Sequence, residues 1–293
     1  MKKVTVRVPA STSNLGPGFD SFGCALTLYT DISFEEKEEG LCITGCDEAY
    51  AGKDNLAYVA YCAAMEAMGE PLRGLRIHID ANIPVCRGLG SSAALLVAGA
   101  MGANALHGNK LSKEELLTIT NVIEGHPDNL APAIFGGLTA SMVEDGIPAT
   151  VGFPLHPDWK FLALVPDFEL STKLSRSVLP EKLNRSDAIY NISHALLLLK
   201  ALETGDEELL RLSMRDKVHQ PYRQGLITDF EQVQSLVAAT GGCLCISGAG
   251  PTLLCITKDD KLASWLGQKL PAVTTASWQV LRLKAEPFGA QVL

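Results

Sequence analysis

The sequence predicts an α/β or α+β protein, and three observations lead to this class. The chain has 293 residues, 47% hydrophobic and 20% charged, enough for one large core or two smaller ones. Glycine is abundant and aromatic residues amount to only 6%, which disfavours a β-sandwich. Stretches that alternate apolar and polar residues are interleaved with longer apolar or amphipathic stretches, the patterns of strands and helices respectively.

The net charge and the hydropathy of the chain limit the classes of partner that we expect for it. The net charge of −8 at pH 7 argues against nucleic acid or an anionic membrane as a partner. No apolar run is long enough to span a bilayer, and residues 1–8 alternate like a strand and not like a signal peptide. The eight cysteines form no Cys-x-x-Cys pair and have no histidine at zinc-like spacing. We therefore expect a cytoplasmic protein with free thiols, mostly in its core.

The first half of the chain alternates between predicted strands and helices. The expected strands cover 4–8, 28–35, 41–45 and 75–80, with a loop over 9–26 and a hairpin joining 28–35 to 41–45. The expected helices cover 54–68, capped by Asp54, then 93–106, and a third that starts at the capping box of Ser112. Residues 93–106 are almost all Ala, Leu, Val, Met and Gly, so this helix must be buried and closely packed.

The turn before that buried helix has the composition of a phosphate site. A helix N-terminus offers unpaired N–H groups and the positive end of the helix dipole. Gly88 and Gly90 let the backbone turn sharply and approach an anion, and Ser91 and Ser92 add hydroxyls. The turn lacks the Lys-Ser/Thr pair of a P-loop and the Gly-x-Gly-x-x-Gly fingerprint. Taken alone, it is equally consistent with a phosphate cradle and with an ordinary turn.

The second half starts where Pro154, Pro157 and Trp159 suggest a crossing between domains, so we expect domains over 1–155 and 156–293. Arg176 is expected near the start of a short helix, an unfavourable place for a cation. An ordinary surface arginine and an arginine directed at a ligand carboxylate explain this position equally well. The expected strands cover 160–166 and 276–284, with a strand–glycine turn–strand unit over 243–256. The expected helices cover 187–204, 206–214, 230–239 and 261–270.

Three segments, in this order along the chain, resemble the motifs of the GHMP small-molecule kinases. The first is Asn14-Leu15-Gly16-Pro17-Gly18-Phe19-Asp20, the second runs from Pro84 to Ala94, and the third is Ser247-Gly248-Ala249-Gly250-Pro251-Thr252. A further segment, Glu124-Gly125-His126-Pro127-Asp128-Asn129, has the form seen in the members that phosphorylate homoserine. The chain between the motifs fits the family fold over nearly its whole length.

The resemblance implies both a fold and an activity. The fold would join an N-terminal domain of the ribosomal protein S5 domain 2 type to a ferredoxin-like C-terminal domain, with ATP and substrate between them. The activity would be ATP-dependent phosphorylation of the L-homoserine hydroxyl, on the route to threonine. The cofactor would be Mg²⁺, and a homodimer is one candidate for the oligomeric state. Two alternatives stay open: a GHMP kinase for another small alcohol, and a non-catalytic ligand sensor on the same fold.

The resemblance also assigns residues to roles. For ATP these are Asn55, Pro84, Arg87, Gly88, Leu89, Gly90, Ser91, Ser92 and Ala93, and for the metal they are Ser92 and Glu124. For the substrate they are Asn14, Asp20, His126, Asp128, Thr172, Arg176, Arg223 and Gly248. Asp20, Asn129 and Arg176 are the catalytic candidates. No lysine lies between Lys3 and Lys37, so the Asp–Lys pair of other members is missing and the presence of a general base stays open.

Overall fold

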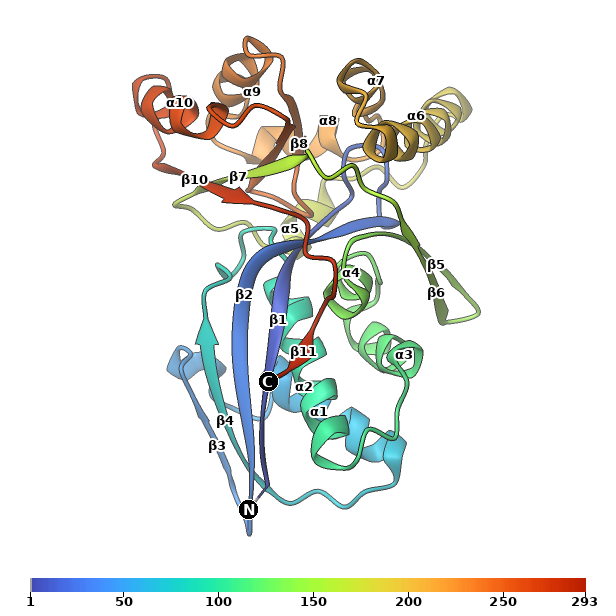
Figure 1. Ribbon diagram of the computed structural model, residues 1–293, viewed down its shortest axis with the longest axis vertical. Helices are drawn as coiled ribbons and strands as arrows, with labels where there is room; N and C mark the ends of the chain where they lie inside the picture. Colours follow the sequence, from blue (N-terminus) through green and yellow to red (C-terminus); the bar gives the residue numbers. More distant parts are fainter. Residues whose placement is uncertain (1) are drawn as a thin grey trace.

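The computed structural model describes residues 2–293 and contains two β-sheets with helices packed against them (Figure 1). The strands are β1 (Lys3–Ser13), β2 (Phe22–Lys37), β3 (Leu41–Thr44), β4 (Gly74–Ala81), β5 (Leu138–Glu144), β6 (Ile147–Phe153), β7 (Lys160–Pro166), β8 (Cys243–Ile246), β9 (Leu253–Thr257), β10 (Trp278–Leu283) and β11 (Gln291–Val292). The helices are α1 (Leu56–Met68), α2 (Ser91–Leu106), α3 (Lys113–Glu124), α4 (Leu130–Phe135), α5 (Thr172–Ser177), α6 (Arg185–Thr204), α7 (Glu207–Ser213), α8 (Gln220–Arg223), α9 (Phe230–Ala238) and α10 (Leu262–Lys269).

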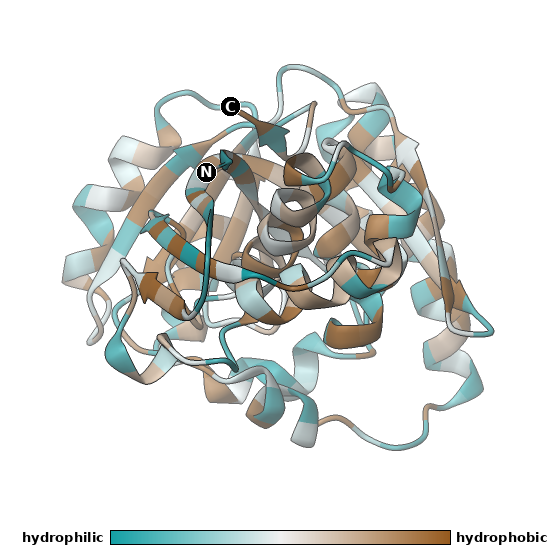
Figure 2. Cartoon of the chain, turned by 90° about the horizontal axis from the view of Figure 1, so that it is seen from below, coloured by the Kyte–Doolittle hydropathy of each residue, from teal (hydrophilic) through white to brown (hydrophobic). Residues whose placement is uncertain are grey.

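The first sheet has the order β11-β1-β2-β4-β3, and β5 and β6 extend it from the start of β2. Helix α2 packs between this sheet and its neighbours α1 and α3, and Figure 2 shows apolar residues concentrated where these elements meet. A Cβ on Gly99 would lie 2.1 Å from the carbonyl oxygen of Ala57 in α1. The close packing predicted from the small residues of this helix is therefore confirmed.

The second sheet has the order β10-β7-β9-β8, and all its neighbouring strands are antiparallel. Numbered from β7, the strands read 4-1-3-2, with helices between the first and second and between the third and fourth. This is the ferredoxin-like βαββαβ arrangement that the resemblance implied. The α+β class is thus confirmed.

The two sheets share one hydrophobic core through β7. Because side chains alternate along a strand, Phe161, Ala163 and Val165 join the core of the first sheet, while Leu162 and Leu164 face a second core with α9 and α10. After β10 the chain returns to the first sheet, where Val292 of β11 pairs with Val6 of β1. The division at residue 155 stays a prediction, and the last residues lie against the first sheet.

Three local predictions were wrong. Residues 28–35 and 41–45 do not form a hairpin, because β4 lies between β2 and β3 and pairs antiparallel with the first and parallel with the second. The loop expected over 9–26 is shorter, because β1 continues to Ser13 and β2 begins at Phe22. Helix α1 is capped by Asn55 and not by Asp54, since the Asn55 side chain accepts from the N–H of Ala57 at 3.0 Å.

Two expectations from composition can also be compared with the structure. Among residues 2–293, no helix combines the length and the apolar character needed to cross a membrane. All eight cysteines are free thiols. Four of them, Cys24, Cys243, Cys245 and Cys255, are buried, whereas Cys86 is exposed in the turn before α2.

Candidate active site

A cavity of about 780 Å³ opens between the N-terminal end of α2 and the loops below the second sheet. The residues assigned from the sequence come from seven segments of the chain, and nearly all of them line it. The exceptions are Pro84, Leu89 and Ala93. The side chains of Leu89 and Ala93 are fully buried in the core, so only their backbone groups could serve a ligand.

The turn that precedes α2 has its carbonyl groups bound by other segments. The carbonyls of Cys86, Arg87, Gly88 and Leu89 accept, in that order, from Leu170 N–H, Thr252 N–H, the Ser247 hydroxyl and Ser11 N–H, at 2.6–3.3 Å. The donors come from three parts of the fold: β1, the segment after β7, and the turn between β8 and β9. Since the first N–H groups of a helix have no intrahelical acceptor, the N–H groups at the start of α2 remain for an anion.

The two glycines of this turn are required by both conformation and space. Gly88 and Gly90 have φ angles of +74° and +71°, the left-handed region that favours glycine. A Cβ on Gly88 would lie 2.3 Å from the Ser247 carbonyl oxygen, and one on Gly90 would lie 2.0 Å from the Ser11 hydroxyl. Strand β1 and the third motif are therefore packed directly against the second motif, which explains why the glycines occupy these positions.

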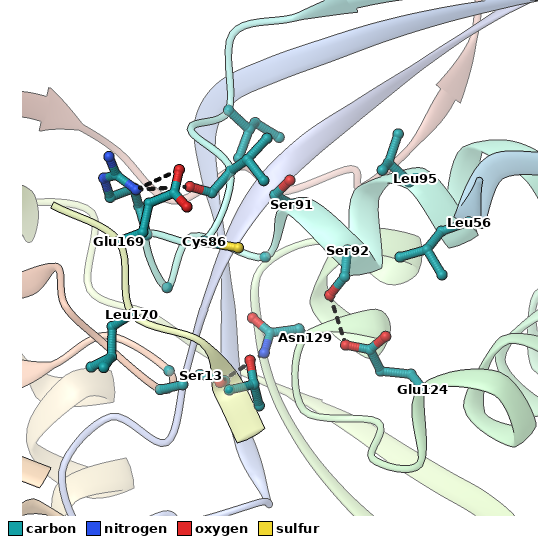
Figure 3. Close-up of a pocket in the computed structure, with 18 of the residues that line it drawn as sticks. Ser13, Leu56, Cys86, Ser91, Ser92, Leu95, Glu124, Asn129, Glu169 and Leu170 are labelled. Atoms are coloured by element: carbon teal, nitrogen blue, oxygen red, sulfur yellow. Dashed lines mark hydrogen bonds and ion pairs between the residues drawn. The ribbon is translucent and has the colours of Figure 1, made fainter. Parts of the chain in front are cut away.

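Ser92 and Glu124, the proposed metal ligands, lie together at the wall of the cavity. The Ser92 hydroxyl donates to Oε1 of Glu124 at 2.8 Å, as Figure 3 shows. Ser92 is in the first turn of α2, and Glu124 is the last residue of α3. A hydroxyl and a carboxylate beside a phosphate-binding helix end are oxygen donors of the kind that Mg²⁺ prefers, so this pair fits the ion.

Asn129, expected as a catalytic residue, has its amide fully engaged by the protein. Its Nδ2 donates to the Ser13 hydroxyl at 2.8 Å (Figure 3), and its Oδ1 accepts from the Ser11 hydroxyl at 2.9 Å. These bonds fix the start of α4 against the end of β1. Ser11 and Ser13 were not singled out from the sequence, where they lay in a predicted loop and not at the end of a strand.

Arg176 and Asp20, which both line the cavity, form an ion pair. Nη1 and Nη2 of Arg176 donate to Oδ2 and Oδ1 of Asp20 at 3.0 and 2.8 Å, a two-pronged geometry. The expectation that Arg176 lies near a helix start was wrong: α5 begins at Thr172, so Arg176 is in its last turn, where the dipole favours a cation. No ligand is needed to explain its place on the helix.

Arg223 is 1% exposed, unusually low for an arginine, and it lines the same cavity. Nε donates to the Ser175 carbonyl at 3.2 Å and Nη1 to the Gly248 carbonyl at 3.0 Å. The same carbonyl of Gly248 accepts from Asn14 Nδ2 at 2.7 Å. Burial, followed by repulsion from Arg176, lowers the pKa of Arg223 to about 10. Arg223 thus remains charged at neutral pH and joins α5 to the third motif, while Asn14 joins the first motif to the third.

The structure adds His219 and Asp216, which the sequence presented only as part of a polar turn. His219 Nε2 lies 2.8 Å from the Gly16 carbonyl and must donate to it, so Nδ1 accepts from Arg223 Nη1 at 3.3 Å. Asp216 accepts from the backbone N–H groups of Val218, His219 and Gln220 and fixes this turn. Burial lowers the pKa of His219, which is therefore neutral in the folded protein at pH 7.

We expect this buried histidine to contribute a pH dependence of stability that His219→Gln removes. Because the folded pKa lies below the ordinary value of about 6.5, the unfolded chain binds the extra proton as the pH falls. The contribution is complete above pH 6.5 and is lost below it, with a slope of at most about 1.4 kcal/mol per pH unit. Urea unfolding of both proteins from pH 5 to 8 measures the difference. Equal slopes in the two proteins would show that His219 does not titrate in this way.

His126 and Asp128 form a second pair beside Arg176. His126 Nδ1 lies 3.3 Å from Asp128 Oδ1, and this interaction raises the pKa of His126 although burial opposes it. Asp128 itself is 2% exposed. The pair adds a carboxylate to the side of the cavity that already holds two arginines.

Two residues expected to bind ATP direct their side chains elsewhere. Arg87 donates to the carbonyls of Pro166 and Asp167 at 3.1 Å and lies 3.4 Å from Glu169. Asn55 caps α1 and donates to the Tyr50 carbonyl at 2.8 Å. Arg87 therefore connects the phosphate loop to the end of β7, and Asn55 orders the segment before α1. Their direct contacts with a nucleotide stay predictions.

The comparisons with known proteins agree with this geometry. Residues 55–137 match the family described as GHMP kinases N terminal domain. The chain is 40% identical to the homoserine kinase of Clostridium beijerinckii, with 99% of this chain and 98% of that one covered. It resembles the crystal structure of homoserine kinase from Cytophaga hutchinsonii with a TM-score of 0.90, 28% identity and coverage of 100% and 98%. For a putative homoserine kinase from Listeria monocytogenes the TM-score is 0.80, the identity 33% and the coverage 99% of each chain.

The two-sheet fold, with a glycine turn at the start of a buried helix, is that of the GHMP kinases, which are ATP-dependent small-molecule kinases. Within that class, the identity and coverage show that this chain belongs to the homoserine kinase family. The family and the enzyme class expected from the three motifs are confirmed.

Proposed function

We propose that this protein transfers the γ-phosphoryl group of ATP to the hydroxyl of L-homoserine and forms O-phospho-L-homoserine, on the route to threonine. The relatives named above are homoserine kinases over their whole length, and the cavity has the matching charges. The observation that supports the substrate best is the presence of Arg176 and Arg223 beside Asp20 and Asp128 in one cavity. A zwitterion with a carboxylate and an ammonium group fits this set of charges.

The residues of the chain act mainly by positioning, as phosphoryl transfer requires. The backbone N–H groups at the start of α2 would bind the phosphates, with Gly88 and Gly90 allowing their approach. Ser92 and Glu124 would hold Mg²⁺, which when bound neutralises charge on the phosphates. The two arginines would hold the substrate carboxylate, and Asp128 its ammonium group. Asp20 would face the hydroxyl and orient it or accept its proton.

The test is release of ADP from MgATP with homoserine, mevalonate, galactose and shikimate offered separately. We expect turnover with homoserine only. Turnover with another of these alcohols would keep the kinase class and overturn the substrate. Tight ATP binding without turnover on any of them would support the alternative of a ligand sensor. The intact phosphate loop and the Ser92–Glu124 pair favour an enzyme over a sensor. A cytoplasmic location and a homodimer stay predictions.

We expect Arg223→Ala to raise the KM for homoserine about 10- to 100-fold, since a charge-assisted hydrogen bond contributes about 1.5–3 kcal/mol. ATP binding, measured by titration, should change little. Because Arg223 is buried and bonded to two carbonyls, the variant should also unfold at a lower temperature.

Arg215→Ala is the matched control, because it removes the same charge from an exposed position eight residues away along the chain. It should alter neither KM nor stability by a measurable amount. An unchanged KM for homoserine in Arg223→Ala, measured below its unfolding temperature, would remove Arg223 from the substrate site.

A further inference from the structure

The Asp20–Arg176 pair has the geometry that a substrate carboxylate would need on the same arginine. Both terminal nitrogens of Arg176 donate to the two oxygens of one carboxylate, at 2.8 and 3.0 Å. An amino-acid carboxylate bound end-on would take the same two bonds. Two carboxylates cannot share that end of one guanidinium. The substrate carboxylate and the Asp20 carboxylate therefore compete for the same two donors of Arg176.

Three carboxylates, Asp20, Asp128 and Asp216, act on the charge of Arg223, and Asp20 is the one of them that can move. Asp216 is fully buried and accepts from three backbone N–H groups in its own turn. Asp128 is 2% exposed and is paired with His126. The Asp20 side chain is about one-third exposed, and among the described residues its carboxylate bonds only to Arg176.

The backbone at Asp20 is fixed independently of its carboxylate. Its N–H donates to Asn14 Oδ1 at 2.9 Å, and Asn14 Nδ2 is in turn bonded to the Gly248 carbonyl. The carboxylate can therefore leave Arg176 by rotation of the side chain, without a rearrangement of the loop. The ring of Phe19 lies under both arginines, with Cζ of Arg176 at 5.7 Å and Cζ of Arg223 at 5.1 Å from its centroid. Arg176 thus keeps a support when Asp20 moves away.

We propose that homoserine binds by exchange: its carboxylate displaces that of Asp20 from Arg176, and the freed Asp20 turns to the substrate. This inference rests on the function proposed above and deepens it. The exchange keeps the charges balanced, because one carboxylate leaves the arginine as another arrives and the substrate ammonium meets the acidic groups. An alcohol without a carboxylate leaves Asp20 paired with Arg176. Asp20 therefore engages a hydroxyl only when an amino-acid carboxylate is present, which makes the ion pair a determinant of specificity.

The test uses butyrate, which has a carboxylate to bind Arg176 but neither a hydroxyl nor an ammonium group with which Asp20 could form a new bond. Its affinity for the whole protein is measured by NMR titration of the wild type, Asp20→Asn and Asp128→Asn. We expect Asp20→Asn to bind butyrate about tenfold more tightly, because the competitor for Arg176 is gone. Asp128→Asn removes the same charge from the same cavity without freeing Arg176, so it should change the affinity only about twofold.

An equal gain in the two variants, or no gain in Asp20→Asn, would overturn the exchange. A thermal unfolding curve for each variant confirms that it is folded at the titration temperature, and Asp20→Ala repeats the test if Asp20→Asn is not. The outcome is independent of turnover. If the wild type phosphorylates homoserine and the variants bind butyrate equally, only the exchange fails, whereas absence of homoserine turnover overturns the proposed function.

Discussion

Glu124→Gln is expected to lower kcat/KM for homoserine about 10²- to 10³-fold, the largest kinetic effect among the substitutions considered. The amide keeps the size of the side chain and can still accept from the Ser92 hydroxyl, so the fold should be preserved. It removes the negative charge that would hold Mg²⁺, and metal stabilisation of phosphoryl transfer is worth several kcal/mol, about tenfold in rate for each 1.4 kcal/mol. Coupled ADP release at several Mg²⁺ concentrations measures the loss.

The control is Glu114→Gln, which removes a carboxylate from the first turn of the same helix, α3. Glu114 does not line the cavity. This variant should retain full activity. We also expect that raising Mg²⁺ restores part of the activity of Glu124→Gln, because a weakened site fills at higher concentration. Kinetics in Glu124→Gln that match the wild type at every Mg²⁺ concentration would remove Glu124 from the metal site.

Gly90→Ala is expected to reduce ATP binding at least about tenfold and to destabilise the fold by roughly 1–3 kcal/mol, the range for a residue forced into a sparsely populated conformation. The φ of +71° disfavours any side chain, and the new Cβ would lie 2.0 Å from the Ser11 hydroxyl. Since Ser11 also donates to Asn129 and, through its N–H, to Leu89, relief of the clash must shift the loop or β1. Nucleotide titration and urea unfolding give the two effects.

Gly267→Ala is the matched control for Gly90→Ala. Gly267 lies inside α10, and nothing approaches within 4 Å of the position that its Cβ would take. Alanine favours a helix interior over glycine by about 0.5–1 kcal/mol, so this variant should be slightly more stable and bind ATP normally. Wild-type ATP affinity in Gly90→Ala would show that the loop tolerates a side chain and that its close packing against β1 is unimportant for binding.

Much of the fold could be predicted because it depends on local patterns. The all-apolar composition of α2 required burial, and the capping box at Ser112 gave the start of α3, which the structure confirms with both reciprocal bonds. Strand pairing could not be predicted in the same way. The apparent hairpin between 28–35 and 41–45 was wrong because β4, which is remote in sequence, lies between the two strands and hydrogen bonds to both.

The candidate site shows the same division at the level of side chains. Motifs identified the residues that line the cavity, including Ser92 and Glu124, which are 32 positions apart yet 2.8 Å from each other. The motifs did not show that the Asp20 carboxylate is hydrogen bonded to both terminal nitrogens of Arg176. Nor did they show that Asn129 is bonded to Ser11 and Ser13, or that Arg87 is bonded to the end of β7. Which hydrogen-bond partner a polar side chain takes depends on groups brought close by other segments.

The sequence by itself determined the family, the glycine turn before α2 and the kinds of charge in the cavity, because these depend on residue types at short spacing. The tertiary structure alone decided how those charges are paired. In the sequence, for example, His219 is only one residue of a polar turn. In the structure it contacts Gly16, 203 positions away along the chain, because the fold brings these two segments together. Burial there excludes water and leaves the imidazole only protein partners, which sets its neutral form and its bond to Arg223.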